Sequence, residues 1–501
     1  MDDIIRASAG DLARHIARRK ISALETASAF LDQIQRFNPA LNAIITLAPD
    51  ILDQARARDE RLAKGGAPRP LEGVPFVVKD NILTKNLRTT YGSYVLQNHI
   101  PEENAICVQR ILDAGGVLLG KTNTSEFATD INTSNPLFGL TRNPIDLNIS
   151  TGGSSGGSAA AIAADFAPIG LGTDLGGSIR IPAAWCGISG LRPSPGRVPV
   201  YPSEFGWDTL VHHVQGPMAR HVEDLGLLLS VIAGQDDRDP ISLPTSSCDY
   251  EKAAAGLADL RGLKIAYCAN LGGIAPVDPE IERLAKQAAA AFQSMGCTVD
   301  EACFNASDIK AIIAGTRGYG IVARFSTLVR DHGNLLTTQL IGQLEDALKL
   351  DLKSVAQAER LRTQYWQRVR AFQDRYDLIL TPTVGAPPFR LDEPLPDKVG
   401  NQPVARYYDI FLLVYAFTLL GLPAASVPCG YTASGAPAGL QIVGRRMRED
   451  QVLNAASAYT HFQPHVLQRR PIRLDEAVEL DYHISTPGMR SATEPTPHAP
   501  Q

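Results

Sequence analysis

Two glycine- and serine-rich segments, TGGSSGGSAAA at 151–161 and GTDLGGSIRIPA at 172–183, constrain the fold of this chain more than any other feature. The usual meaning of such a composition is a flexible linker. The first segment, however, continues into AAAIAADFAPIGLG, which predicts a helix and then a strand, and Gly-Gly-Ser returns immediately afterwards. Glycine permits backbone turns that other residues resist, and it lets the main chain approach another group closely. We therefore interpret both segments as ordered turns rather than as linkers.

The rest of the chain alternates short apolar strands with helices, as α/β proteins do. The first 65 residues predict a helical layer, in which Ser22 and Glu25 form a capping box and Asn38-Pro39 ends a helix. With 501 residues, 44% of them hydrophobic and 20% charged, the chain is long enough for roughly three globular domains or one large α/β unit. The predicted strands are 74–78, 117–119, 264–268, 377–381 and 441–444. The predicted helices follow Pro101 or span 221–233, 279–295 and about 449–461, and a helical tract is predicted over about 306–375.

The charge of the chain argues against several kinds of partner. Lys and Arg number 48 against 53 Asp and Glu, and the formal net charge of −5 is spread without long blocks of either sign. A nucleic-acid groove or a polybasic membrane patch would need a block of positive charge. We therefore expect a small-molecule ligand, with neither nucleic acid nor membrane as a partner.

Three further features bear on where in the cell the protein is located. The cysteines are odd in number and never form a CxxC pair, which favours reduced thiols in a cytoplasmic protein. The N-terminal MDDIIRASAG lacks the apolar core of a secretory signal. Residues 410–429 carry no charge, but Gly421, Pro423 and Pro428 interrupt them, so we expect a buried helix and a core strand rather than a membrane span. The seven cysteines are Cys107, Cys186, Cys248, Cys268, Cys297, Cys303 and Cys429.

Two motifs suggest a ligand but lie in the wrong context. Residues 115–122, GGVLLGKT, satisfy the phosphate-loop pattern GxxxxGK[ST]. A phosphate loop follows a strand and opens a helix, whereas 117–119 is itself a predicted strand. His212, His213 and His221 have no Asp, Glu or Cys between them at ligand spacing, and adjacent histidines point apart on any regular element. We therefore expect neither a cofactor nor a metal site.

Ser178 carries the strongest chemical signal in the sequence. It lies in Gly-Gly-Ser-Ile, where glycines can present a hydroxyl at a sharp turn and consecutive amide N–H groups to an anion. A serine nucleophile needs such a hydroxyl and such an oxyanion hole. The pattern differs from the G-x-S-x-G turn of α/β-hydrolases, and no histidine base is evident near it.

At these residues the chain resembles the amidase signature family. The resemblance implies an α/β fold with a single large α/β/α domain around a mixed β-sheet. That domain would span 66–480, with 1–65 as a helical layer of the same domain and 481–501 as a disordered tail. The matching segments keep the family's order from about residue 70 to 445, and they are GVPFVVKDN at 73–81, GKTNTSEF at 120–127, TRNP at 141–144, GGSSGGSAAA at 152–161, GTDLGGSIRIPA at 172–183, CGISGLRPSPGRV at 186–198, GPMAR at 216–220, and LPAASVPCG with GLQIVG at 422–444.

The resemblance assigns the chemistry to three side chains: Ser178 as nucleophile, Ser154 as a bridging serine after a cis peptide bond, and Lys79 as base. Ser154 precedes Ser178 by 24 residues, which fits the family, and Lys79 ends the predicted strand. Burial beneath Val77 and Val78 would lower the pKa of Lys79. A neutral amine could then take a proton from Ser154, while Ser154 takes one from Ser178 as it attacks a carbonyl.

The neighbours of the serines are expected to support this chemistry. Cys186 is the weaker alternative as a nucleophile, because no glutamate motif of a nitrilase-type site accompanies it. The residues expected to hold the turns by hydrogen bonds are Ser155, Asp174 and Arg180. The backbone amides expected to form the oxyanion hole are those of Leu175, Gly176, Gly177 and Ser178.

Three functions are open to a chain of this family. The first is a stand-alone amidase for small amides, including anilides, esters or carbamates; the second is the glutaminase subunit of a tRNA-dependent amidotransferase. The third, a catalytically silent interaction protein, is disfavoured because all three catalytic side chains are present.

The segment before Gly421 bears on the choice between the first two functions. The resemblance places an acid about ten residues before this glycine in glutamine-using members, where it holds the substrate's α-ammonium. A gapless count back from Gly421 reaches Phe411, although Arg362 lies near the place of their carboxylate-binding arginine. We therefore expect apolar or aryl amide substrates and a monomer or homodimer that needs no other chain. The expected pocket wall includes Phe411 and Tyr415, from the run Phe411, Leu412, Leu413, Tyr415 and Phe417.

Overall fold

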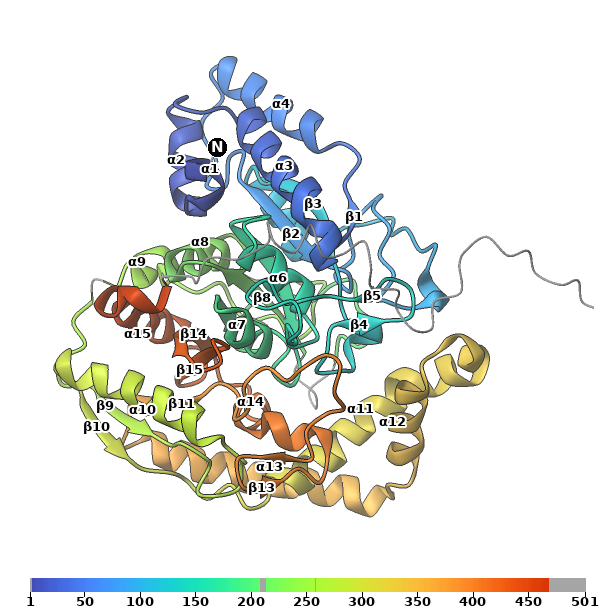
Figure 1. Ribbon diagram of the computed structural model, residues 1–501, viewed down its shortest axis with the longest axis vertical. Helices are drawn as coiled ribbons and strands as arrows, with labels where there is room; N and C mark the ends of the chain where they lie inside the picture. Colours follow the sequence, from blue (N-terminus) through green and yellow to red (C-terminus); the bar gives the residue numbers. More distant parts are fainter. Residues whose placement is uncertain (1, 208–212, 257, 468–501) are drawn as a thin grey trace, which may run out of the picture.

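Apolar segments spread over most of the chain pair into one mixed sheet at the centre of the molecule (Figure 1). The computed structural model describes residues 2–207, 213–256 and 258–467, and eleven strands of this part form the sheet. Across the sheet the strands are β1 (Ile44–Leu47), β3 (Val117–Thr122), β2 (Pro75–Lys79), β6 (Ile169–Asp174), β8 (Val214–Ala219), β7 (Ser189–Arg192), β14 (Ala424–Tyr431), β15 (Pro437–Val443), β11 (Leu378–Pro382), β9 (Lys264–Tyr267) and β10 (Thr298–Glu301).

Parallel and antiparallel pairs alternate in blocks across this sheet. Strands β3, β2 and β6 are parallel, and so are β11, β9 and β10, whereas the pairs between β6 and β11 are antiparallel. The strand pattern predicted an α/β fold, and the mixed sheet is the one that the family resemblance implies. Two short hairpins lie outside it, β4 (Ser134–Asn135) with β5 (Gly139–Leu140) and β12 (Lys398–Val399) with β13 (Gln402–Pro403).

Helices fill the chain between the strands. The α-helices are α1 (Asp2–Arg6), α2 (Ala9–Ala17), α3 (Ala23–Leu41), α4 (Ile51–Ala63), α5 (Ile106–Asp113), α6 (Gly156–Ala163), α7 (Arg180–Cys186), α8 (Val222–Ile232), α9 (Tyr250–Ala254), α10 (Pro279–Ser294), α11 (Ile309–His332), α12 (Thr338–Leu348), α13 (Leu352–Gln373), α14 (Leu412–Thr418) and α15 (Glu449–Phe462). Short 3₁₀ helices are η1 (Tyr94–Leu96), η2 (Glu126–Ala128), η3 (Gly333–Leu335), η4 (Tyr407–Phe411) and η5 (Pro464–Leu467).

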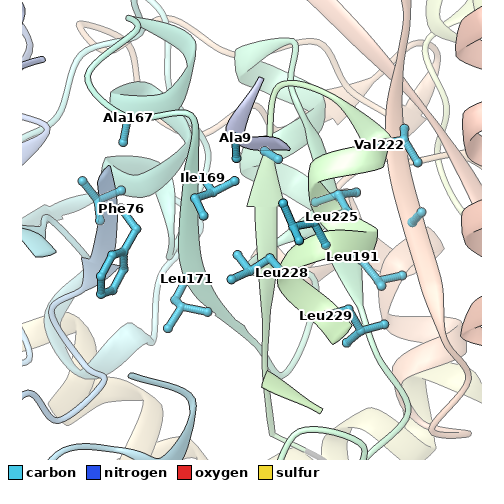
Figure 2. Close-up of a cluster of buried hydrophobic side chains, with 14 of the residues drawn as sticks. Ala9, Phe76, Ala167, Ile169, Leu171, Leu191, Val222, Leu225, Leu228 and Leu229 are labelled. Carbon is cyan, nitrogen blue, oxygen red and sulfur yellow. The ribbon is translucent and has the colours of Figure 1, made fainter. Parts of the chain in front are cut away.

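The two faces of the sheet bury separate apolar clusters. Alternate residues of a strand point to opposite faces, and in β15 Ile442 joins one cluster while Val443 joins the other. The first cluster contains residues of α8, α10 and α15, and Figure 2 shows Leu225 and Leu228 of α8 beside Ile169 of β6. The second contains residues of α7, α11, α13 and α14. The sheet is thereby covered on both faces, which explains why β2, β6 and β15 are buried along their whole length.

The first 65 residues are less uniformly helical than expected. The capping box of Ser22 and Glu25 opens α3 as predicted. Two expectations are wrong: α3 continues through Pro39 to Leu41, and residues 44–47 form β1, an edge strand of the main sheet. The helix ends instead at Asn42, whose left-handed backbone donates its N–H to the Asn38 carbonyl. The proposed tail, 481–501, lies outside the described residues.

The expectation of seven reduced cysteines is also wrong, because Cys268 and Cys303 form a disulfide. The two residues are 35 positions apart in sequence. Strands β9 and β10 pair in parallel with Tyr267 opposite Glu301, so the segments that leave both strands emerge side by side. A search for closely spaced cysteines cannot detect this pairing. The other five cysteines are free.

The uncharged run 410–429 is buried, as expected. It comprises the end of η4, then α14, and then the start of β14, and every residue from Ile410 to Cys429 is buried. In the described part of the chain, no helix combines the length and apolar character needed to cross a membrane.

Candidate active site

The two glycine-serine turns meet beside the end of β6. Ser154 and Ser155 precede α6, and Ser178 precedes α7. The N–H of Ser155 donates to the Ser178 carbonyl at 3.2 Å, which ties the turns together. The Ser155 hydroxyl is 3.3 Å from both the carbonyl oxygen and the amide nitrogen of Thr173. The Gly153–Ser154 peptide bond is cis.

Gly177 shows why the second turn requires glycine. Its φ angle is +116°, in the region that residues with a side chain rarely adopt. A Cβ added there would also lie 2.4 Å from the Val414 side chain. The turn can therefore pack against α14 only without a side chain at this position.

Lys79 reaches the first turn from the end of β2. Its side chain is completely buried, and its Nζ lies 2.7 Å from Ser154 Oγ and 2.9 Å from Thr173 Oγ1. Burial lowers the pKa of Lys79 well below its usual value, although the nearby Asp174 carboxylate opposes this effect. A lowered pKa favours the neutral amine, and the neutral amine can accept the proton of a hydroxyl.

A buried ion pair holds the second turn. The Asp174 carboxylate accepts hydrogen bonds from the amides of Gly177 and Ile179 and from the Arg180 guanidinium, whose Nε is 2.9 Å away. Burial alone would raise the pKa of Asp174, but Arg180 and Arg192 bring it well below its ordinary value. Arg180 donates further hydrogen bonds to acceptors on α14 and β15, and these acceptors are the Val414 carbonyl, Thr418 Oγ1 and Gln441 Oε1.

We expect Arg180→Met to destabilise the fold by about 3–5 kcal/mol, because it would leave the Asp174 charge buried without its main partner. Arg180 and Asp174 are both 0% exposed. The free energy of unfolding in a denaturant titration measures the effect. Arg390→Met is the control: Arg390 pairs with Asp392 at the surface, where an ion pair contributes about 0–1 kcal/mol. Equal losses in the two variants would contradict a central role for the buried pair.

A cavity of about 760 Å³ opens onto the two turns. Ser154, Ser178 and Thr173 lie in its wall. Of the amides predicted for an oxyanion hole, those of Leu175, Gly176 and Ser178 belong to residues that line the cavity. The amide of Gly177 does not serve, because it donates to Asp174 Oδ1 at 2.9 Å. Much of the remaining wall is apolar or aromatic, with Leu83, Tyr91, Leu96, Phe127, Ile131, Ile181, Val200, Tyr201, Phe205, Ile241, Ile321, Phe325, Leu328, Tyr407 and Phe411.

Comparison with known proteins decides the family. The amidase family model matches residues 25–453. The chain belongs to the amidase signature family. An acylamidase of Rhodococcus erythropolis is 34% identical over 460 residues, covering 91% of this chain and 95% of the relative. A glutamyl-tRNA(Gln) amidotransferase subunit of Carboxydothermus hydrogenoformans is 35% identical over 491 residues, covering 90% and 96%.

The fold of solved amidases agrees with this assignment. A bacterial aryl acylamidase of the amidase signature family superposes with a TM-score of 0.86 at 29% identity, covering 93% of this chain and 99% of that structure. A 6-aminohexanoate cyclic dimer hydrolase with bound substrate gives a TM-score of 0.82 at 28% identity, covering 94% and 99%. This amidase is therefore an amide-hydrolysing enzyme.

The aromatic run before Gly421 contributes less of the amidase's cavity than expected. Phe411 lines the cavity. Tyr415 does not; its ring packs behind Gly176, where a Cβ on the glycine would be 2.7 Å from it. The side chains of Leu412, Leu413 and Phe417 lie in the core. They turn inward because α14 is buried on every side, so it presents no separate face to the cavity.

The charged residues of the cavity wall are also not those singled out in the sequence. Arg362 lies away from the cavity lining and donates to the Leu419 carbonyl at 2.8 Å. Asp409, two residues before Phe411, pairs with Lys310 at 2.9 Å instead of facing the cavity. Asp130 and Arg317 do line it. The sequence offered no signal for Arg317, because only the tertiary fold determines which residues of a long helix line a cavity.

The rejected ligand motifs have other roles in the structure. Residues 117–122 are β3, and Lys121 at its end donates to Thr84 Oγ1 at 2.8 Å, in a buried site that lowers its pKa to about 8. Of the three histidines, His213 lines the cavity, and burial, followed by the positive charge of Arg324, lowers its pKa to about 3. His221 is the N-cap residue of α8, and His212 lies outside the described residues. Within the described ranges, no cluster of His, Cys, Asp and Glu could hold a metal.

Cys186 does not share the cavity with the serines. It is buried at the end of α7, and burial raises the pKa of its thiol. Its Sγ is 3.5 Å from the Thr151 carbonyl. A thiol kept protonated and away from the cavity is a poor nucleophile.

Proposed function

We propose that this amidase hydrolyses small apolar or aryl amides, anilides included, through an acyl-enzyme on Ser178. The observation that carries the proposal is the 2.7 Å contact between Lys79 Nζ and Ser154 Oγ, beside a cavity whose wall also contains Ser178. The acylamidase relative and the aryl acylamidase structure support the substrate class. The enzyme would act as a monomer or homodimer.

The proposed reaction begins with a proton relay. Neutral Lys79 accepts the Ser154 proton while Ser154 accepts the Ser178 proton, and Ser178 Oγ attacks the amide carbonyl. The amides of Leu175, Gly176 and Ser178 would stabilise the tetrahedral oxyanion, an interaction in which one lost donor costs about 10²–10³ in rate. The relay then returns a proton to the leaving amine. Water would resolve the ester on Ser178 by the same steps.

The cavity wall supports the preference for apolar substrates. Aromatic and aliphatic side chains from several elements surround the serines, and burial of apolar substrate surface contributes about 25 cal/mol per Å². Two positions bear on glutamine recognition through the resemblance: the position of the expected acid holds Phe411, and Arg362, near the place of the expected arginine, lies away from the cavity lining.

Glutaminase activity within an amidotransferase is the second candidate. Asp130 and Arg317, of opposite charge, both line the cavity and could face the ammonium and carboxylate of an amino acid. Several relatives at 32–36% identity are subunits of glutamyl-tRNA(Gln) amidotransferases. Arg317 is, however, already engaged by Gln343 Oε1 at 2.9 Å and lies over the Tyr407 ring.

One screen distinguishes the two functions. The purified chain alone is incubated with p-nitroanilides, other aryl amides, carbamates and glutamine, and the release of amine or ammonia is measured. Turnover of aryl amides without added proteins supports the proposal. Activity confined to glutamine, or seen only with partner subunits and charged tRNA, would establish the glutaminase instead.

We expect kcat/KM to rise with pH and then level off. Lys79 must be neutral to accept a proton, so activity is lost as pH falls through its pKa, which burial places well below the ordinary lysine value. Initial rates between pH 5 and 10 measure the profile, with circular dichroism at each pH to show that the protein stays folded. A steady fall in kcat/KM from pH 6 to 9 in folded protein would contradict a lysine base.

A further inference from the structure

Asn81 contacts the catalytic network but has no role in the mechanism above. It follows Lys79 by two residues and lines the cavity. Its Nδ2 donates to Thr173 Oγ1 at 3.1 Å, and Thr173 Oγ1 in turn lies 2.9 Å from Lys79 Nζ. The Asn81 amide oxygen is buried and has no hydrogen-bond partner in the described structure. Thr173 is therefore the polar group that fixes this side chain.

The number of hydrogen bonds that the Thr173 hydroxyl can donate and accept determines what the contact with Asn81 does. A threonine hydroxyl has one proton to donate and two lone pairs that accept, and a neutral lysine amine has two N–H groups and one lone pair. If Asn81 and Lys79 each donate to Thr173, both lone pairs of the hydroxyl are used. The single lone pair of Lys79 is then left for the Ser154 hydroxyl.

Without Asn81, Thr173 could turn its own proton toward the amine. Lys79 Nζ has two oxygens within hydrogen-bond distance in the described structure, and they belong to Ser154 and Thr173. A Thr173 hydroxyl that donates to Lys79 would occupy the lone pair that must accept the Ser154 proton. The direction of one hydrogen bond thus decides whether the base is available.

We propose that Asn81 is a positioning residue for the base: through Thr173 it keeps the lone pair of Lys79 directed at Ser154. This inference rests on the proposed role of Lys79. It assigns Asn81 no contact with the substrate, and it predicts that Asn81 and Thr173 act through the same step.

The charged groups around Lys79 define the electrostatic background. Asp174 lies at the end of β6, and its charge favours the ammonium form of Lys79. His213, just before β8, is kept neutral by its lowered pKa. Asp80, the residue that follows Lys79, accepts hydrogen bonds from Thr90. None of these groups contacts Lys79 Nζ directly in the described structure, so the direct partners are the two hydroxyls.

The test is a double-mutant cycle in the intact enzyme, with an aryl amide that the wild type cleaves. We expect Asn81→Leu and Thr173→Val each to lower kcat by about 10²-fold with little change in KM, since misdirection of a reacting group can cost that much. The double variant should be no slower than the worse single variant. Thr173→Ser, which keeps the hydroxyl, should restore most of kcat. Additive losses, or wild-type kcat in Asn81→Leu, would overturn the proposal.

The pH profile of Asn81→Asp supplies a second readout, beside the split between kcat and KM. A carboxylate can accept the Thr173 proton and so keep it away from Lys79, which preserves the plateau rate. The added negative charge favours the ammonium form, and it should shift the rise of kcat/KM upward by about one pH unit or more. An unshifted profile would contradict the inference. If Lys79 is not the base at all, the wild-type profile itself lacks the rise, and the two failures are thereby distinguished.

Discussion

Ser178→Ala is expected to lose at least about 10⁴-fold in kcat while it remains folded. The substitution removes the oxygen that would attack the amide carbonyl, and members of a catalytic triad typically contribute on this scale. Lys79→Ala and Ser154→Ala should show comparable losses, because the three groups form one relay. Steady-state rates against an aryl amide measure the loss, and near-identical unfolding curves would show that Ser178→Ala has not lost its structure.

Two further variants test whether Ser178 is the nucleophile and whether it acts as a unit with Lys79. Cys186→Ala removes the other candidate nucleophile and should retain turnover, since Cys186 lies outside the cavity lining. In the double variant Ser178→Ala/Lys79→Ala, the loss should not exceed that of Ser178→Ala by much, because groups that act as a unit are not additive. Full turnover in Ser178→Ala together with inactivity of Cys186→Ala would reverse the assignment of the nucleophile.

The wild-type enzyme is expected to prefer an aryl amide to glutamine by about 10³-fold or more in kcat/KM. Phe411 places an aromatic ring in the cavity wall, and an α-ammonium brought there without a partner would lose several kcal/mol of hydration. Phe411→Asp should reduce this preference, because a carboxylate in the wall makes binding of the aryl amide less favourable and binding of the glutamine ammonium more favourable. Competition assays with both substrates measure the ratio directly.

Phe411→Leu is the matched control for this substitution. It keeps an apolar side chain at the same position and should retain the preference for the aryl amide. A wild-type enzyme that already hydrolyses glutamine efficiently would contradict the proposed substrate class. In that case Asp130 and Arg317 would be the first residues to test as its amino-acid site.

Local sequence patterns predicted most of the central architecture. Strand β2, strand β3 and the helices α8, α10 and α15 were each indicated by short apolar runs or helical periodicity, and the structure confirms them. The resemblance to amidases brought Lys79 and Ser154 together, although they are 75 residues apart in sequence, and the structure places their polar atoms 2.7 Å apart. The order of the motifs indicates which residues lie together because the motifs lie at strand ends and turns. At such places the backbone geometry allows few other residues or conformations.

Features that depend on tertiary pairing could not be predicted in this way. The Cys268–Cys303 bond follows from the parallel register of β9 and β10. Arg317 lies in the cavity wall with Ile321 and Phe325, which belong to the same helix, α11, and only the tertiary fold brings this helix to the cavity. Asn81 and Thr173 lie inside predicted motifs, but their link through a single hydroxyl is a matter of side-chain direction. Tyr415 was misplaced for the same reason.

Strand β1 has a consequence for where this enzyme can be shortened. It pairs with β3 at one end of the sheet, and β3 in turn pairs with β2, the strand that ends in Lys79. A chain that began at residue 66, where the predicted helical layer ends, would lack this strand and leave the main-chain N–H and C=O groups of β3 unsatisfied. Exposed edges of this kind recruit strands from other molecules. The N-terminal segment thus shields the sheet against self-association, two strands away from the base.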